Sequence, residues 1–480
     1  MRRREHCGVV GAYSFDGQNV SPIIIKASRG LQHRGQESWG IAVGNKLHKA
    51  LGLVTDTCIE VHDAPTKMRG NLGIGHVRYS TKGKTTLDNA HPLEIKASNR
   101  FFIAHNGTIA NTEELAKRIA EKGYSPNRNA TDTELMGLRL SQIYERKREW
   151  FEAFGLLDEE LNGAYSIVIL TELGELIAAR DRRGFRPLCL GQHKDSNSYV
   201  VVSESCALDY IKADFIRDVN PGEIIKIDRE GLESHRFSEE ERHAHCPFEY
   251  TYFSHPSSNI EGKNVYLSRK NIGRELAKKY AGTMKGDIII PIPDSARPGA
   301  LGLSEASGIK LEEGLMKDRY RRKGSLRSFI EPEKREAIVR EMIPIKSAIE
   351  GREVVVIDDS IVRGTTSREV VKRLKHASAK KIQWYVIFPP IIYPCYMGID
   401  FPTQEELAVP KICGNCTELG EINNGVAKYL DVTYLGYNDV EGLSRGIGLR
   451  KDELCLACTT GNYSCLRQRP RFKTREEMKS

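Results

Sequence analysis

Residues 354–367, with the sequence VVVIDDSIVRGTTS, constrain the fold more than any other segment of this chain. The first four residues are β-branched, which predicts a buried strand in a parallel sheet. Two adjacent carboxylates, Asp358 and Asp359, follow the strand, and a helical pattern begins at Arg368. Because open α/β sheets bind ligands at the carboxyl ends of their strands, we expect a binding site in this strand–loop–helix unit.

The loop between the acid pair and the helix has the chemistry of a phosphate site. It contains Ser360, Arg363, Gly364, Thr365 and Thr366. A glycine allows close approach of the backbone, and amides and hydroxyls at a helix start can bind a phosphate. The two acids can accept hydrogen bonds from neighbouring ribose hydroxyls. A solvated, acid-capped turn is the alternative, but the order of these features favours a sugar phosphate.

This loop resembles the phosphoribosyl diphosphate (PRPP) signature of the phosphoribosyltransferases. The resemblance implies that Asp358 and Asp359 bind the ribose hydroxyls. It also implies that the Arg-Gly-Thr-Thr loop, preceded by Ser360, holds the 5-phosphate.

A second candidate site begins at Cys7, within the sequence HCGVVG. A buried structural thiol is the default interpretation of such a cysteine. If residues 1–6 are removed as a propeptide, however, Cys7 has a free α-amino group beside its thiol. That amine, with an unperturbed pKa of about 7.7–8.0, can act as the base for its own nucleophile.

Four motifs follow Cys7 in the first third of the chain. They are LQHRGQE at 31–37, GHVRYST at 75–81, HNGT at 105–108 and TDTE at 131–134. Each is weak alone, since Asn-Gly is usually a turn, but in this order they resemble the N-terminal-nucleophile glutamine amidotransferases.

That resemblance implies a role for each of six residues. Cys7 attacks the glutamine carboxamide, and Asn106 with the Gly107 amide forms the oxyanion hole. The other three line the site: Arg78 pairs with the substrate carboxylate, Asp132 binds the substrate ammonium, and Arg34 helps to shape the site.

The two halves together resemble the amidophosphoribosyltransferases over nearly the whole chain. Further matching segments are residues 181–188, 203–207, 249–253, 293–295 and 455–458. The resemblance implies conversion of glutamine, PRPP and water to 5-phosphoribosylamine, glutamate and diphosphate, with internal transfer of ammonia, as the first step of purine (IMP) biosynthesis. It also implies Mg²⁺ at Ser295, Asp358 and Asp359, which would neutralise the diphosphate.

The predicted fold has two domains. Residues 7–240 mix short strand-like runs with helical patterns, and the resemblance implies an α+β N-terminal-nucleophile hydrolase domain, a four-layer αββα sandwich. Residues 241–480 show βαβ patterns and are expected to form an α/β phosphoribosyltransferase domain with a parallel sheet. Its tail, from about residue 400, is expected to be helical and cysteine-rich.

The eleven cysteines suggest metal binding or catalysis in a chain without a secretory signal. One alternative joins Cys413-x-x-Cys416 to Cys455-x-x-Cys458 as a zinc site, although the pairs lie farther apart than the typical ~15–20 residues. The other set matches the ligands of the [4Fe–4S] members of the family: Cys246, Cys395, Cys455 and Cys458. We favour the iron–sulfur cluster, because four thiolates suit it; free buried thiols are the third option. Cys465 has no assigned role.

Composition gives weaker constraints. The net charge of +8 suits an anionic substrate, and no apolar run reaches the ~18 residues of a membrane span. We therefore expect a cytoplasmic enzyme without membrane or nucleic-acid partners. The family resemblance implies a homodimer or homotetramer, inhibited by purine nucleotides such as AMP and GMP.

Three features depart from the family pattern. The loop at 321–326 is about four residues longer than usual, a lysine is missing near 341–343, and His91 stands where glutamine is common. The first two concern closure over PRPP. Two alternatives therefore remain: a diverged paralog with a glutaminase half and another acceptor, or a PRPP- or nucleotide-sensing regulator. Such regulators carry a DNA-binding module, and none is visible here.

Overall fold

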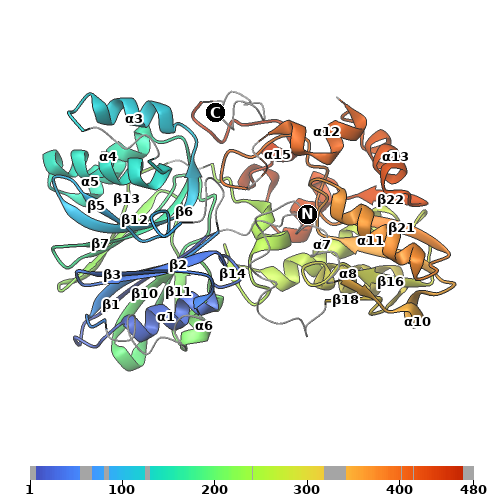
Figure 1. Cartoon of the computed structure of the whole chain (residues 1–480), viewed down its shortest axis with the longest axis horizontal. Coiled ribbons are helices and arrows are strands. Elements are labelled where there is room, and N and C mark those ends of the chain that lie inside the picture. Colours follow the sequence, from blue (N-terminus) through green and yellow to red (C-terminus); the bar gives the residue numbers. More distant parts are fainter. Residues whose placement is uncertain are drawn as a thin grey trace.

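The computed structural model describes residues 7–54, 68–79, 86–124, 130–239, 242–317, 342–399, 401, 403–414 and 416–468. These residues form two lobes that lie side by side (Figure 1). The N-terminal lobe contains two stacked sheets, and the C-terminal lobe is built around one parallel sheet. None of the helices in these ranges combines the length and apolar character needed to span a bilayer.

The N-terminal lobe contains two antiparallel sheets. The seven-stranded sheet has the order β11 (Asp214–Asp218), β9 (Cys189–His193), β10 (Ser198–Val202), β1 (Gly8–Ser14), β4 (Leu72–Arg78), β2 (Ser38–Val43), β3 (Lys46–Leu51). The six-stranded sheet has the order β13 (Gly231–Arg236), β12 (Glu223–Asp228), β8 (Leu176–Arg180), β7 (Gly163–Thr171), β6 (Arg100–Ile109), β5 (Leu93–Lys96).

Alternation of side chains along the strands produces four layers. Val9 and Val168 lie in the apolar core between the sheets, whereas their neighbours Val10 and Ile167 face the covering helices. The first sheet is covered by α1 (Ser21–Gly30) and α6 (Cys206–Ile211), and the second by α3 (Thr112–Ala120), α4 (Asp132–Lys147) and α5 (Trp150–Glu160) (Figure 1). The predicted αββα sandwich is confirmed.

The C-terminal lobe has a five-stranded sheet in which every pair is parallel. Its order is β17 (Lys310–Leu311), β16 (Ile288–Pro291), β20 (Glu353–Asp358), β21 (Lys381–Val386), β22 (Tyr434–Tyr437). Its helices are α7 (Val265–Lys279), α8 (Arg297–Ser307), α10 (Lys346–Ile349), α11 (Thr365–His376), α12 (Ala408–Cys413), α13 (Leu419–Leu430), α14 (Val440–Ile447) and α15 (Ala457–Thr460). Two small antiparallel sheets of two strands each complete it: β14 (Asn259–Ile260) with β15 (Lys263–Asn264), and β18 (Leu315–Lys317) with β19 (Met342–Pro344).

Two local expectations need correction. Helix α11 begins at Thr365 rather than Arg368, because Gly364 takes a left-handed conformation at its N-cap, so both threonines lie in the first turn. The tail is not wholly helical, because β22 pairs with β21 at the edge of the sheet. The pairing gives the backbone amides and carbonyls of β22 hydrogen-bond partners on β21. No pattern in the tail sequence indicates this strand.

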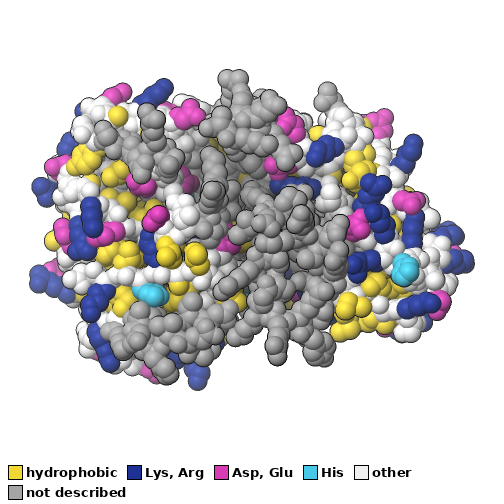
Figure 2. Space-filling model, in the orientation of Figure 1, with side chains coloured by type: hydrophobic (Ala, Val, Ile, Leu, Met, Phe, Trp, Pro, Cys, Tyr) yellow, Lys and Arg dark blue, Asp and Glu magenta, His cyan; other side chains and the backbone are white. Residues whose placement is uncertain are grey.

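Charged side chains are distributed over both lobes. On the face shown in Figure 2, basic and acidic side chains of the described residues are interspersed on each lobe.

Two of the three departures from the family pattern fall at or beside residues 318–341, which lie outside the described part of the chain. The longer loop at 321–326 is wholly within that range. In the segment 341–343, where the family lysine is missing, Met342 and Ile343 belong to β19 and Glu341 is not described. The expected effects on closure over PRPP therefore stay predictions.

Close packing of α7 against α8 positions the loop that precedes α8. A Cβ at Gly273 would lie 1.9 Å from the Gly299 carbonyl oxygen, and one at Gly302 would lie 1.8 Å from the Lys270 carbonyl oxygen. These contacts are shorter than any van der Waals separation, so the helices approach this closely only because both positions lack side chains.

We expect Gly273→Ala to destabilise the C-terminal lobe by about 1–3 kcal/mol, because the helices must separate to admit the methyl group. Urea unfolding followed by circular dichroism measures the change. Gly282→Ala is the matched control, since a Cβ there meets nothing within 4 Å. Equal stability of the two variants would contradict the packing argument.

Candidate active site

Cys7 lies directly before β1, a central strand of the seven-stranded sheet. Its Sγ is 3.6 Å from the Tyr79 carbonyl oxygen, and Arg34 Nε donates to the Cys7 carbonyl oxygen at 3.0 Å. Burial raises the pKa of the Cys7 thiol, while the positive charges of Arg78 and Arg34 oppose that rise. The thiol therefore needs a base or a cation to become a nucleophile.

The side chain of Asn106 on β6 is fully buried, yet its amide nitrogen and oxygen have no hydrogen-bond partner among the described residues. Leaving such groups unpaired is costly, which indicates that they are kept for a ligand. Gly107, the next residue, has φ +151°, and a Cβ there would lie 2.0 Å from the Ala164 carbonyl oxygen. Only glycine fits this position.

Two buried histidines, His76 and His91, hold the backbone of His105, just before Asn106. The His105 amide donates to His91 Nδ1 at 3.4 Å, and His76 Nε2 donates to the His105 carbonyl oxygen at 3.1 Å. Burial lowers the pKa of His76 to about 3, so this ring is neutral near pH 7. His91, the departure from the family pattern, thus accepts a hydrogen bond that fixes the strand.

Asp132 and Arg78 approach the same site from α4 and β4. Asp132 is the first residue of α4, and its carboxylate accepts from the Ile109 amide at 3.1 Å and the Thr133 amide at 2.8 Å. Arg78 is the last residue of β4, and its buried Nη1 has no hydrogen-bond partner in the described ranges. Both charges act on the Cys7 thiol, so the fold gathers the predicted glutamine-binding residues around Cys7.

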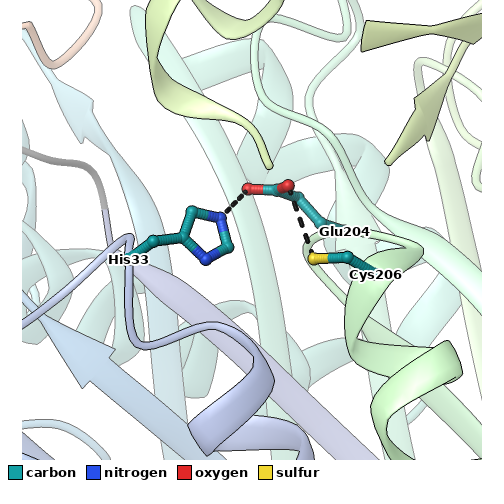
Figure 3. A group of neighbouring side chains, drawn as sticks. All are labelled: His33, Glu204 and Cys206. Carbon is teal, nitrogen blue, oxygen red and sulfur yellow. Dashed lines mark hydrogen bonds and ion pairs between the residues drawn. The ribbon is translucent and has the colours of Figure 1, made fainter. Parts of the chain in front are cut away.

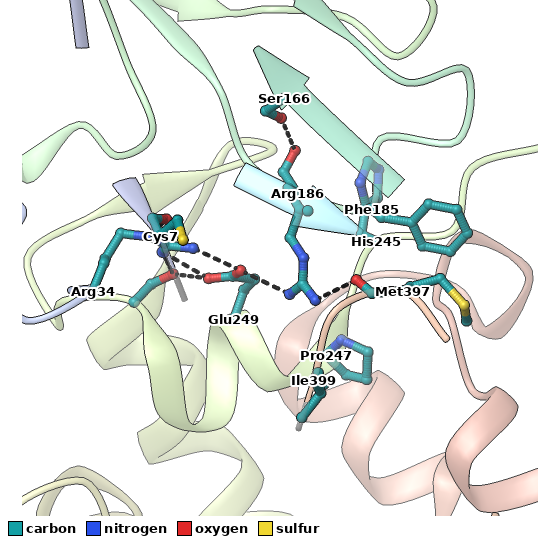
Figure 4. A network of polar contacts seen from close by, with 12 residues as sticks. Cys7, Arg34, Ser166, Phe185, Arg186, His245, Pro247, Glu249, Met397 and Ile399 are labelled. Carbon is teal, nitrogen blue, oxygen red and sulfur yellow. Dashed lines mark hydrogen bonds and ion pairs between the residues drawn. The ribbon is translucent and has the colours of Figure 1, made fainter. Parts of the chain in front are cut away.

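A buried ion-pair network links Arg34 to the other lobe. Arg34 donates two hydrogen bonds to Glu249, both of 2.9 Å (Figure 4). Arg186 donates to the same carboxylate at 3.2 Å and to the Met397 carbonyl oxygen at 2.6 Å. Although burial disfavours a charged guanidinium, Glu249 and Glu204 hold the pKa of Arg34 above its ordinary value.

Sequence reasoning assigned no role to Glu249 or Arg186, although both lie in segments that match the family. Glu249 opens the π-helix η3 (Glu249–Phe253), a rare element that often marks functional sites. The signal available in the sequence was the charge of Glu249 within the largely apolar segment 249–253. Only the folded chain shows that these charges meet.

Glu204 also joins His33 and Cys206, a group whose ligand atoms all lie within 4.8 Å of one another (Figure 3). Its carboxylate already pairs with Arg34 and accepts from Ser258 Oγ at 2.7 Å. A metal ion here would lie beside a buried guanidinium. The hydrogen bonds therefore account for this group without a metal.

The acid pair lies at the carboxyl end of β20, as predicted. Ser295 Oγ donates to Asp359, and Ser360 Oγ donates to the same carboxylate at 2.9 Å. Ser367 Oγ donates to Asp358 at 3.4 Å. Because β16 pairs in parallel with β20, the Ser295 loop and the acid pair meet at one edge of the sheet.

The loop after the acid pair bends into α11 at Gly364, whose φ is +73°. The Thr366 hydroxyl oxygen is buried without a hydrogen-bond partner among the described residues. Arg363 pairs with Glu406, and the Ala408 amide donates to the Val362 carbonyl oxygen at 2.7 Å. The cysteine-rich tail thus supports the predicted phosphate loop.

The four predicted cluster cysteines gather between the lobes. Burial raises the pKa of Cys246 to about 12 and that of Cys458 well above its ordinary value, and the neighbouring Cys395 thiol adds to both shifts. Cys395 Sγ accepts hydrogen bonds from the Met397 and Ile399 amides, each at 3.4 Å. Such donors stabilise a thiolate.

The spacing of these thiols is too wide for one zinc ion. No three cysteine sulfurs of the described residues lie within 4.8 Å of one another, whereas four thiolates at ~2.3 Å from a tetrahedral Zn²⁺ would be roughly 3.8 Å apart. The alternative zinc set is not brought together, since Cys413 and Cys416 lie against Glu421 instead.

Known proteins resemble this chain over almost its full length. A model of the glutamine amidotransferase domain matches residues 76–210. The chain is 41% identical to the amidophosphoribosyltransferase of Methanocaldococcus jannaschii, covering 95% of this chain and 97% of that protein. The Bacillus subtilis amidophosphoribosyltransferase is 38% identical, with coverages of 96% and 94%. The chain belongs to the amidophosphoribosyltransferase family.

Solved structures give the same result for the fold. The B. subtilis glutamine PRPP amidotransferase complexed with ADP and GMP matches with a TM-score of 0.82 at 37% identity, covering 95% of this chain and 97% of that chain. A structure described as the allosteric regulatory enzyme of purine biosynthesis matches with a TM-score of 0.83 at 37% identity, covering 97% and 98%. The two lobes described above therefore have the amidophosphoribosyltransferase fold.

We expect Glu249→Gln to destabilise the protein by about 3–5 kcal/mol, because it leaves Arg34 and Arg186 buried beside a neutral group. Thermal unfolding in low salt measures the loss. Glu350→Gln, in the exposed pair with Lys346, is the control and should leave the midpoint unchanged. A stable Glu249→Gln variant would show that the network does not support the fold.

Proposed function

We propose that this protein converts glutamine, PRPP and water into 5-phosphoribosylamine, glutamate and diphosphate, the first step of de novo purine biosynthesis. One observation carries the proposal: an unpartnered, buried Asn106 amide and the Cys7 thiol occur in the same chain as the acid pair on β20, in the part of the chain that the structure describes. Family membership over nearly the full length supports it.

The first half-reaction is glutamine hydrolysis at Cys7. With residues 1–6 removed, the α-amino group of Cys7 takes the thiol proton, and Sγ attacks the carboxamide carbon. Asn106 and the Gly107 amide stabilise the resulting oxyanion, while Arg78 and Asp132 hold the carboxylate and ammonium of glutamine. Collapse releases ammonia, and water then frees glutamate from the thioester.

The second half-reaction takes place at the edge of the parallel sheet. Asp358 and Asp359 bind the ribose hydroxyls of PRPP, and the loop from Ser360 to Thr366 holds the 5-phosphate. Ammonia from the first site attacks C1, and diphosphate leaves. Ser295 and the acid pair supply hard oxygen ligands that fit Mg²⁺, which would neutralise charge on the leaving group.

Two further features belong to this proposal. The sulfurs of Cys246, Cys395, Cys455 and Cys458 would hold a [4Fe–4S] cluster that ties the tail to the N-terminal lobe. Purine nucleotides would inhibit the enzyme, an inference supported by a relative that was solved with ADP and GMP. A homodimer or homotetramer in the cytoplasm stays a prediction.

The coupled reaction is tested by measuring glutamate and diphosphate release from glutamine, with and without PRPP and Mg²⁺, after purification without oxygen. We expect PRPP to stimulate glutamate release and diphosphate to appear in equal amount. Cys7→Ala should abolish the glutamine-dependent reaction and keep the ammonia-dependent one. Glutaminase activity that ignores PRPP would favour a paralog with another acceptor.

We expect Asn106→Ala to lower kcat for glutamine hydrolysis by about 10²–10³-fold, because it removes one oxyanion-hole donor. Synthesis from free ammonia should be unchanged, which shows that the variant is folded. Asn45→Ala, at an exposed hairpin turn of the same lobe, is the matched control. If Asn106→Ala lowered kcat no more than Asn45→Ala does, Asn106 would not be part of the oxyanion hole.

A further inference from the structure

A fifth buried cysteine lies beside the four predicted cluster ligands. The Sγ atoms of Cys465 and Cys455 are 4.0 Å apart. Both side chains are buried, and both lie with Tyr463 in one apolar cluster. The Tyr463 hydroxyl donates to the Pro394 carbonyl oxygen at 2.6 Å, which fixes this turn next to Cys395.

Cys465 also borders a cavity. The cavity has a volume of about 240 Å³, and its lining includes Arg182, Arg183 and Arg467 as well as Cys465. The four predicted ligands are absent from that lining. The three arginines of this lining would attract a small anionic disulfide to the Cys465 thiol.

The segment that carries Cys465 is held on the N-terminal lobe. The Arg467 amide donates to Asn162 Oδ1 at 3.1 Å, and Asn162 Nδ2 donates to the Gln468 carbonyl oxygen at 2.9 Å. These bonds hold the Cys465 segment without using any of the four predicted ligands. A disulfide needs an Sγ–Sγ distance of about 2.05 Å, so side-chain rotation must close roughly 2 Å.

We propose that Cys465 forms a reversible disulfide with Cys455 when the protein holds no cluster. This inference rests on the cluster in the proposed function. A low-molecular-weight disulfide first exchanges with Cys465, giving a mixed disulfide and one free thiol. Cys455 then attacks the mixed disulfide, so two cysteine thiols are oxidised and one external disulfide is reduced to two thiols.

The disulfide has two consequences for a cluster-free protein. It removes Cys455 from the ligand set, so a cluster cannot assemble until a dithiol reduces the bond. It also protects Cys455 from oxidation to the sulfinic state, which is irreversible for most proteins. A protein that has lost its cluster would then be reduced and take up a new cluster, rather than suffer irreversible oxidation of Cys455.

The test uses full-length protein that has been freed of iron and treated with oxidised glutathione. Alkylation, digestion without reductant and mass spectrometry should detect a cross-linked pair of peptides containing Cys455 and Cys465. Cys465→Ser should abolish this product, whereas Cys458→Ser, which removes a predicted ligand but neither of the two paired thiols, should keep it. Iron and sulfide uptake is then measured before and after the oxidant.

Wild-type protein should lose most of its iron uptake after oxidation and regain it with dithiothreitol, whereas Cys465→Ser, which cannot form the disulfide, should keep most of its uptake through the same treatment. Absence of the Cys455–Cys465 product in a protein that binds iron would overturn the proposed disulfide role of Cys465 and would leave the proposed cluster standing. A protein that never binds iron would overturn the cluster, and with it this role, even if the disulfide forms.

Discussion

The buried carboxylate of Glu249 is the point on which the two halves of this structure depend. It pairs with Arg34, which holds the Cys7 carbonyl oxygen, and with Arg186, which holds the Met397 carbonyl oxygen. Each of these charges would be costly to bury alone. Together they join the residue that precedes β1 to the loop that follows Cys395, so the glutaminase site and the tail cannot be positioned independently.

The same segment also contacts the second site. Arg269 on α7 donates to the Tyr250 carbonyl oxygen at 2.8 Å and to the Ser254 carbonyl oxygen at 2.7 Å. Burial lowers the pKa of Arg269 to about 10, and Asp359 opposes that shift. The π-helix that begins at Glu249 therefore lies between the Cys7 network and the acid pair. A movement of this helix would therefore shift residues at both sites.

Unsatisfied polar groups mark where ligands are expected. The buried Asn106 amide and the Thr366 hydroxyl have no hydrogen-bond partner among the described residues, although both sit in well-packed surroundings. Leaving these groups unpaired lowers the free energy of unfolding. Their presence therefore fits a role in holding an oxyanion at one site and a phosphate at the other. Neither group contributes to stability by itself.

Local sequence determined much of this protein. The β-branched strand, the acid pair and the Gly364 loop were predictable because a strand, a carboxylate and a glycine each act over a few residues. The α+β mixture of the N-terminal half was predictable for the same reason, whereas its four-layer αββα order was implied only by the family resemblance. The tertiary structure alone decided the partnership of Glu249 with Arg34 and Arg186, the edge strand β22 and the nearness of Cys465 to Cys455. These depend on contacts between residues far apart in the chain, and no local pattern specifies which distant group a buried charge or thiol will meet.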